Sequence, residues 1–120
     1  MPATILVVDD DPAVRRPLIK VLEREGFMPI AASNGSEALA YLRGGGDADA
    51  ILLDLRMPVM DGWTFRREQL RDPRLAPIPV VVLSGADQDR VAEIHGAAAF
   101  QKPMRLGAVI AVLRDLCPHV

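Results

Sequence analysis

Short apolar segments alternate with amphipathic segments five times along the 120 residues, and this alternation constrains the fold more than any other feature. The apolar segments are residues 5–8, 28–32, 51–53, 80–83 and 98–101. Continuous apolar runs such as 5–8 are typical of strands buried on both faces. The segments between them carry apolar residues at helical spacing, for example Val14, Leu18 and Leu22. The pattern predicts five consecutive β-α units with no segment left over.

Helix boundary signals support this division. Asp11 followed by Pro12 is typical of an N-cap and a first helical residue. Asn34 with Glu37 three residues later resembles a capping box. The same kinds of signal predict that Gly26 ends the first helix, that Asp61 and Gly62 open a helix closed by Asp72 and Pro73, that Asp87 caps a short helix reaching about His95, and that the last helix covers 104–116.

Pro17 is the one residue that disagrees with its predicted element. Inside a helix, proline removes a hydrogen bond and clashes with the preceding turn, at a cost of about 3 kcal/mol. We expect either a kink at Pro17 or a helix that begins later than Pro12.

Strands that alternate with helices favour a parallel sheet covered on both faces, that is, an α/β fold. Right-handed crossovers restrict the possible topologies. A doubly wound sheet in the order 2-1-3-4-5 accommodates five units and places a ligand site at the carboxyl ends of strands 1 and 3. We expect one domain over residues 1–120.

Composition excludes several classes of function. The net charge is −2, and the only basic pairs, Arg15-Arg16 and Arg66-Arg67, are expected on solvated helix faces, so no nucleic-acid interface is predicted. No apolar stretch approaches the roughly 20 residues that span a membrane. The N-terminus lacks the pattern of a signal peptide, which favours the cytoplasm. The single cysteine, Cys117, cannot form an internal disulfide and is expected to pack as an apolar residue.

Polar residues stand where the predicted strands end. Asp9, Asp10 and Asp11 follow the first strand, Asp54 the third, Ser84 the fourth and Lys102 the fifth. In the predicted topology these strand ends lie together at one edge of the sheet. For Asp11 and Asp61 a helix-capping role is the simpler explanation. Capping does not explain Asp9, Asp10 and Asp54 together with a hydroxyl and an ammonium.

Each of these groups suits phosphoryl transfer. Clustered carboxylates repel, and a hard divalent cation such as Mg²⁺ relieves the repulsion. Asp10 and Asp54 are suited to bind Mg²⁺ directly, and Asp9 through water. A carboxylate can also act as the nucleophile toward phosphorus. Lys102 supplies a cation and Ser84 a hydroxyl for the transferring group.

These residues and their surroundings resemble the response-regulator receiver family of two-component signalling. The matching stretches are residues 5–11, 52–62, 80–86 and 102–103. The resemblance covers nearly the whole chain and implies the flavodoxin-like (βα)₅ sandwich of that family, similar to a single-domain chemotaxis regulator. The resemblance implies either a regulator that acts alone or the receiver of a longer protein.

The resemblance implies a role for each site residue. Asp54 would be the phosphoacceptor, with Asp9, Asp10 and the backbone carbonyl of Arg56 around Mg²⁺. Ser84 and Lys102 would bind the new phosphoryl group. The Lys102-Pro103 bond would be cis, and Gly85 would leave the pocket open. Residues at the positions of Arg56 and Ala86 would tune dephosphorylation.

The chain departs from the family at the aromatic switch position, three residues before Lys102, where it has Ala99. Phe100 lies one residue later. Either Phe100 takes the switch role across a local irregularity, or the aromatic switch is absent. We expect Phe100 to be a packing residue.

The resemblance implies that a histidine kinase or histidine phosphotransfer protein donates the phosphoryl group. A downstream protein would then bind the face formed by helix 4, strand 5 and helix 5. Enzymatic activity would be limited to the chain's own phosphorylation and dephosphorylation. Two rivals stay open: a degenerate receiver that binds proteins without taking phosphate, and a flavodoxin-like cofactor binder. Against the second, three aspartates follow the first strand and would repel a cofactor phosphate.

Overall fold

Five parallel strands form a sheet in the order β2-β1-β3-β4-β5, as the alternation predicts. The computed structural model describes residues 2–85 and 88–118, without the side chains of residues 88 and 89. The strands are β1 (Thr4–Val8), β2 (Met28–Ala32), β3 (Ala50–Asp54), β4 (Val80–Ser84) and β5 (Ala98–Gln101). The helices are α1 (Pro12–Arg24), α2 (Gly35–Arg43), α3 (Gly62–Arg71), α4 (Gln88–Val91), which continues as the 3₁₀ turn η1 (Ala92–Ile94), and α5 (Leu106–Leu116).

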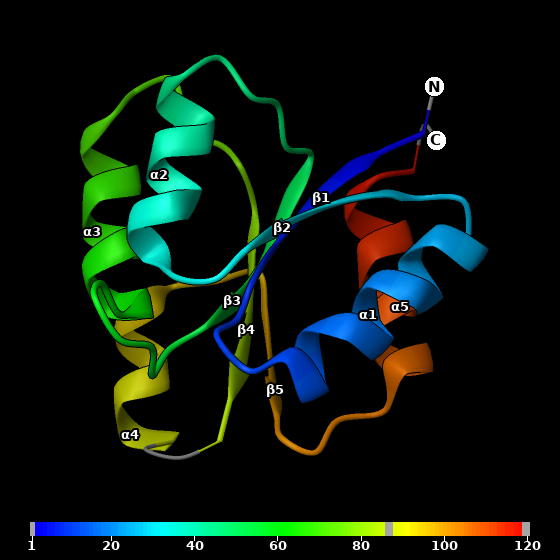
Figure 1. Cartoon of the computed structure of the whole chain (residues 1–120). Helices are drawn as coiled ribbons and strands as arrows, with labels where there is room; N and C mark the ends of the chain where they lie inside the picture. Colours follow the sequence, from blue (N-terminus) through cyan, green and yellow to red (C-terminus); the bar gives the residue numbers. More distant parts are fainter. Residues whose placement is uncertain (1, 86–87, 119–120) are drawn as a thin grey trace.

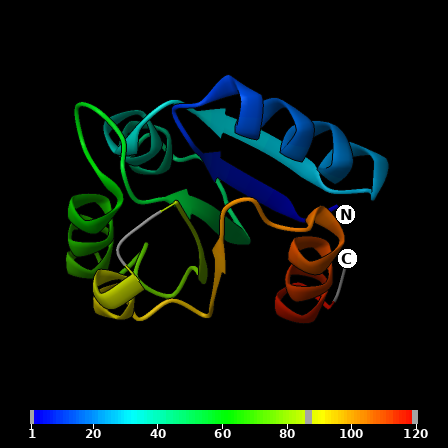
Figure 2. The same ribbon diagram turned by 90° about the horizontal axis from the view of Figure 1, so that it is seen from below.

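The helices cover both faces of the sheet. Figure 1 shows α1 and α5 on one side and α2, α3 and α4 on the other, and the view from below in Figure 2 shows the same three layers. This arrangement and the strand order confirm the doubly wound α/β fold.

Among the described helices, none combines the length and the apolar character that a membrane crossing requires.

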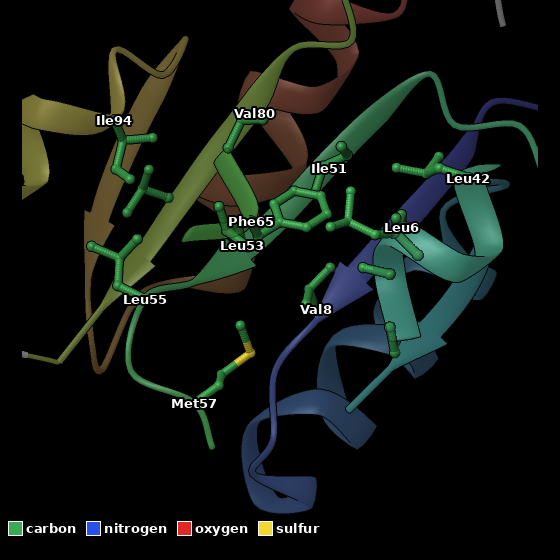
Figure 3. Packing of buried hydrophobic residues seen from close by; sticks show 14 of the residues in the cluster. Leu6, Val8, Leu42, Ile51, Leu53, Leu55, Met57, Phe65, Val80 and Ile94 are labelled. Carbon is green, nitrogen blue, oxygen red and sulfur yellow. The ribbon is translucent and has the colours of Figure 1, made fainter. Parts of the chain in front are cut away.

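The strands separate two apolar clusters. Leu6, Ile51 and Val80 face the side of α2 and α3, where Phe65 packs among them (Figure 3). Ile5 and the alternate residues of the same strands face α1 and α5. Since neighbouring residues of a strand point to opposite faces, both faces need apolar side chains, which explains the continuous apolar runs. Each fully buried large side chain contributes about 1.5–3 kcal/mol.

Capping residues set the helix ends as predicted. The side chain of Asp11 accepts a hydrogen bond from the backbone in the first turn of α1, and Asp61 does so in α3. Asn34 Oδ1 accepts from the backbone N–H of Glu37 at 2.9 Å. Glu37 returns a bond one residue further out than a standard capping box, to the N–H of Ser33 at 2.9 Å.

The predicted start of the first helix at Pro12 is confirmed, and the predicted start of the last helix needs correction. Helix α1 begins at Pro12 and includes Pro17, so the later start is wrong. Helix α5 begins at Leu106 instead of residue 104, because Arg105, in extended conformation, occupies the N-cap position. The predicted cap Asp87 and the predicted pocket residue Ala86 lie outside the described residues.

Phe100 is partly buried and packs against the apolar cluster on the side of α1 and α5, as expected of a packing residue. It pairs with Leu83 across the sheet. Ala99 is exposed and, on the opposite face, lines a hollow of about 240 Å³ together with Val91 and Ala92. The alternation of side chains along β5 therefore keeps Phe100 away from the α4 side, where Ala99 leaves space.

Candidate phosphoacceptor site

An acidic cluster lies at the carboxyl edge of the sheet. Asp54 ends β3, and Asp9 follows β1, whose Val8 pairs with Leu53. The parallel register therefore brings the two aspartates next to each other. Asp9 is fully buried and Asp54 nearly so, at 4% exposure, whereas Asp10 is exposed. One carboxylate oxygen from each of the three lies within 4.8 Å of the others.

Lys102 follows β5, the strand at one edge of the sheet, and its side chain reaches this cluster. Its Nζ lies 2.9 Å from Asp9 Oδ2 and 3.2 Å from Asp54 Oδ1. Its backbone N–H donates to the carbonyl of Ser84 at 2.7 Å, and the Lys102-Pro103 peptide bond is cis, as predicted. One ammonium thus bridges two buried carboxylates, one directly after β1 and one at the end of β3.

Burial and the neighbouring charges alter the pKa values of Asp54 and Lys102. Burial, reinforced by the negative charge of Asp9, raises the pKa of Asp54 from 3.8 to about 6, although Lys102 opposes the rise. Burial by itself would lower the pKa of Lys102. The hydrogen bond to Asp9 and the charges of Asp54 and Asp9 outweigh it, so the pKa of Lys102 is raised. The ammonium is therefore firmly protonated, and Asp54 is mostly ionised near neutral pH.

Arg15 contributes to the site in a way that the sequence analysis missed. Its Nη1 donates to the backbone carbonyl of Asp9 at 2.7 Å, while Asp9 Oδ1 accepts the N–H of Asp11 at 2.9 Å. The prediction that Arg15 and Arg16 lie together on a solvated face is wrong for Arg15, which is half-buried, and correct for Arg16. Adjacent helical residues point about 100° apart, so only one of a pair can turn inward.

Ser84 and Arg56 lie where the topology predicts. Ser84 is buried at 3% exposure and ends β4, one residue beyond Leu83, the partner of Asp54. Arg56 is exposed in the loop after β3, two residues past Asp54. Among the described residues, a Cβ added to Gly85 would meet no atom within 4 Å, in agreement with the predicted open pocket.

The loop after Asp54, called here the acceptor loop (residues 55–61), has a constrained backbone. The N–H of Gly62 donates to the carbonyl of Leu55 at 2.8 Å, and a Cβ on Gly62 would lie 2.5 Å from the carbonyl oxygen of Asp54. Val59 has a φ of 68° and is 84% exposed. A positive φ is strained for a β-branched residue, so strain is stored in the loop that follows Asp54.

The donor set fits a hard divalent cation. Carboxylate oxygens and a backbone carbonyl are the ligands that Mg²⁺ takes, usually with water and phosphate oxygens. Three carboxylates against one ammonium leave the cluster with excess negative charge when all are ionised. The residues present thus suit the cofactor that the sequence resemblance implies.

Comparisons with known proteins agree with this fold. Residues 5–114 match the family described as the response regulator receiver domain. The transcriptional regulatory protein TcrA of Mycobacterium tuberculosis is 34% identical over 114 residues, which cover 93% of this chain and 45% of TcrA. Protein PilH of Pseudomonas aeruginosa is 33% identical over 87 residues, or 72% of this chain and 71% of PilH. The chain thus spans less than half the length of TcrA.

Solved structures show the same fold. The signal receiver domain of a histidine kinase from Syntrophus aciditrophicus matches with a TM-score of 0.89 and 30% identity, covering 98% of this chain and 92% of that one. The response regulator TrrA of Thermotoga maritima, in complex with Mg²⁺-BeF, matches with a TM-score of 0.83 and 25% identity, covering 97% and 99%. This chain belongs to the response regulator receiver family and is a receiver domain of two-component signalling.

Proposed function

We propose that the chain accepts a phosphoryl group on Asp54 in a Mg²⁺-dependent reaction. The observation that carries this proposal is the contact of the Lys102 ammonium with both Asp54 and Asp9, at 3.2 and 2.9 Å. This contact places a carboxylate, which can act as the nucleophile, next to an ammonium, which can pair with the incoming phosphoryl group. Membership of the receiver family supports the same chemistry.

The residues divide the work in the following way. With a pKa of about 6, Asp54 is mostly ionised at pH 7 and needs no general base to attack. One of its oxygens forms a bond to phosphorus, the P–N bond of a phosphohistidine breaks, and its electron pair returns to the imidazole nitrogen. Lys102 then pairs with a phosphoryl oxygen, and the Ser84 hydroxyl donates to another.

The carboxylates of Asp9, Asp10 and Asp54 and the backbone carbonyl of Arg56 would hold Mg²⁺. When bound, it supplies positive charge that offsets the negative charge of the carboxylates and of the phosphoryl oxygens. Lys102 and Arg15 keep Asp9 in position with or without it, through the side chain and the backbone carbonyl respectively.

The partners are proposed on the same basis. Response regulators act with histidine kinases, and a kinase or a histidine phosphotransfer protein is the proposed donor here. The face of α4, β5 and α5 is the proposed output surface for a downstream protein. The single domain over residues 1–120, the absence of a nucleic-acid interface and the cytoplasmic location stay predictions from the sequence.

Phosphorylation is tested by incubating the protein with Mg²⁺ and a small acyl phosphate and measuring the intact mass. We expect a gain of one phosphoryl group that chelation of the metal abolishes. Asp54→Asn should show no gain. The matched control Asp47→Asn changes an exposed carboxylate in the loop after α2 and should behave as the parent.

A phosphoryl group that still appears on Asp54→Asn would remove Asp54 from its proposed role. Failure of the parent protein to take any phosphoryl group, with Mg²⁺ and donor in excess, would instead favour the degenerate receiver, a module that binds proteins without phosphorylation.

A further inference from the structure

Side chains of α3 hold the backbone of α4 and η1. Trp63 Nε1 donates to the carbonyl of Arg90 at 3.0 Å. Arg66 Nε donates to the carbonyl of Ile94 at 2.9 Å, and its Nη2 donates to that of His95 at 3.1 Å. Trp63 and Arg66 lie three positions apart on one face of α3. Figures 1 and 2 show α4 beside α3 on the same side of the sheet.

These bonds satisfy carbonyls that the short helix cannot satisfy itself. The last carbonyls of any helix lack an intrahelical partner. Helix α4 has four residues and η1 three, so much of their backbone depends on outside donors. The buried Ile94 supplies one core anchor. The position of this segment therefore depends strongly on the donors of α3.

Arg66 is itself fixed by a buried amide. Its Nη1 donates to Gln69 Oε1 at 2.8 Å. Gln69 is fully buried, and its Nε2 donates to the carbonyls of Leu75 and Ile78, both at 3.0 Å. The Arg66 guanidinium is thereby oriented toward η1 by the core of the protein. The prediction that Arg66 and Arg67 both lie on a solvated face is wrong for Arg66, which is half-buried.

The indole of Trp63 also connects α4 with the acceptor loop. The guanidinium of Arg90 lies 4.0 Å from the ring centroid, and that of Arg56 lies 5.7 Å from it. Trp63 itself is only 5% exposed. Both guanidinium groups are within the distance at which the ring attracts a cation. One side chain thus contacts a residue two positions from Asp54 and a residue of α4.

We propose that Trp63 and Arg66 are positioning residues that form a latch on α4 and η1, and that Arg56 makes this latch sensitive to the state of Asp54. The second half rests on the proposed phosphorylation. A phosphoryl group adds negative charge two residues before Arg56, and a guanidinium that turns toward it leaves the Trp63 ring. The contacts of Trp63 with Arg90 then change, and with them the hold on α4. This chain has Ala99 on β5 at the position of the aromatic switch, so the proposed coupling between Asp54 and α4 runs through Trp63 of α3.

The latch itself is tested on the unphosphorylated protein by amide hydrogen exchange. Arg66→Lys keeps the positive charge but loses the forked donors to Ile94 and His95. We expect exchange of the backbone amides of residues 91–95 to accelerate about thirtyfold, as the loss of two net hydrogen bonds of about 1 kcal/mol each implies. Amides of β1 and β3 should be unchanged. The neighbouring control Arg67→Lys should change neither, because Arg67 is exposed and bonds within α3, to Thr64 Oγ1.

Trp63→Phe provides a second variant, which retains an aromatic ring but lacks the donor to Arg90. We expect a smaller acceleration of the same amides, about fivefold for one hydrogen bond. It also serves if Arg66→Lys does not fold. Exchange of residues 91–95 that stays at the parent rate in the folded variants would overturn the latch.

Coupling to Asp54 is tested through the fluorescence of Trp63, the one tryptophan of the chain. In the parent protein, Mg²⁺ and an acyl phosphate should alter both its emission and its quenching by acrylamide. In Arg56→Gln, molecules whose mass includes the phosphoryl group should show no such change. A mass gain without a change of emission in the parent would reject the coupling and leave the proposed function standing. Absence of a mass gain would reject the proposed function and leave the exchange result valid.

Discussion

Replacing Asp54 by Asn should stabilise the metal-free protein at alkaline pH. The pKa of Asp54 is raised from 3.8 to about 6, so the folded state binds this proton more tightly than the unfolded state. Folding stability therefore falls as the pH rises from about 4 to about 6, and the loss is complete above the folded pKa. Asn resembles the neutral carboxyl group and removes the penalty, while Lys102 keeps its 2.9 Å contact with Asp9.

The size of the effect follows from the shift. A pKa of about 6 in place of 3.8 corresponds to about 3 kcal/mol of unfavourable free energy once Asp54 is ionised in both states. We therefore expect Asp54→Asn to exceed the parent by up to about 3 kcal/mol at pH 8. The excess should decline toward zero near pH 4, where the parent carboxyl is protonated in the folded protein.

The assay is urea unfolding of both proteins, with a metal chelator, at a series of pH values from 4 to 8. Adding Mg²⁺ should narrow the gap at pH 8, because the ion binds the folded parent more tightly than the variant. Asp47→Asn, in an exposed loop position, controls for a general effect of net charge. A gap that is absent at pH 8, or that does not vary with pH, would refute the crowded-carboxylate explanation.

Three further changes test other parts of the structure. Gly62→Ala should lower stability by about 1–3 kcal/mol and weaken Mg²⁺ binding measured by calorimetry, because its Cβ would lie 2.5 Å from the carbonyl oxygen of Asp54. Val59→Gly should raise the free energy of unfolding by about 0.5–1 kcal/mol, since relief of the positive φ outweighs the greater chain entropy of glycine; lower stability in urea would contradict the strain. Gln69→Leu leaves two carbonyls after α3 without their donor and should cost about 2–4 kcal/mol in the same assay, whereas Leu70→Gln, at an exposed site, should cost less than about 0.5.

The sheet and the acidic cluster could be predicted because both depend on local patterns. A strand segment buried on both faces must be apolar at every position, as residues 5–8 of β1, 50–53 of β3 and 80–83 of β4 are. Capping side chains act within three residues of themselves, so Asp11, Asn34 and Asp61 mark the helix starts in sequence. Once the strand order follows, residues after strand ends must meet at one edge.

The arginine contacts could not be predicted because they join distant segments. Arg66 reaches residues 28 and 29 positions away, and a half-buried arginine on a helix has the same local pattern as a solvated one. The only available signal is that adjacent arginines on a helix cannot share one orientation, so a pair is a candidate for one inward member. Arg15 and Arg66 are the inward members, and each donates to a backbone carbonyl.

The charge of the acidic cluster links stability to function. Three carboxylates and one ammonium carry a net charge of −2 when all are ionised, and the raised pKa of Asp54 indicates that Lys102 alone does not compensate for burial and for Asp9. Well-satisfied neighbours hold this unfavourable arrangement in place: Arg15 and the N–H of Asp11 hold Asp9, and the close packing of Gly62 against the backbone holds Asp54. A divalent cation has the charge that balances the cluster. The carboxylates already lie close together and carry excess negative charge. Binding of a cation would therefore gain Coulomb energy without the cost of bringing the carboxylates together. That advantage favours a functional site over a structural one.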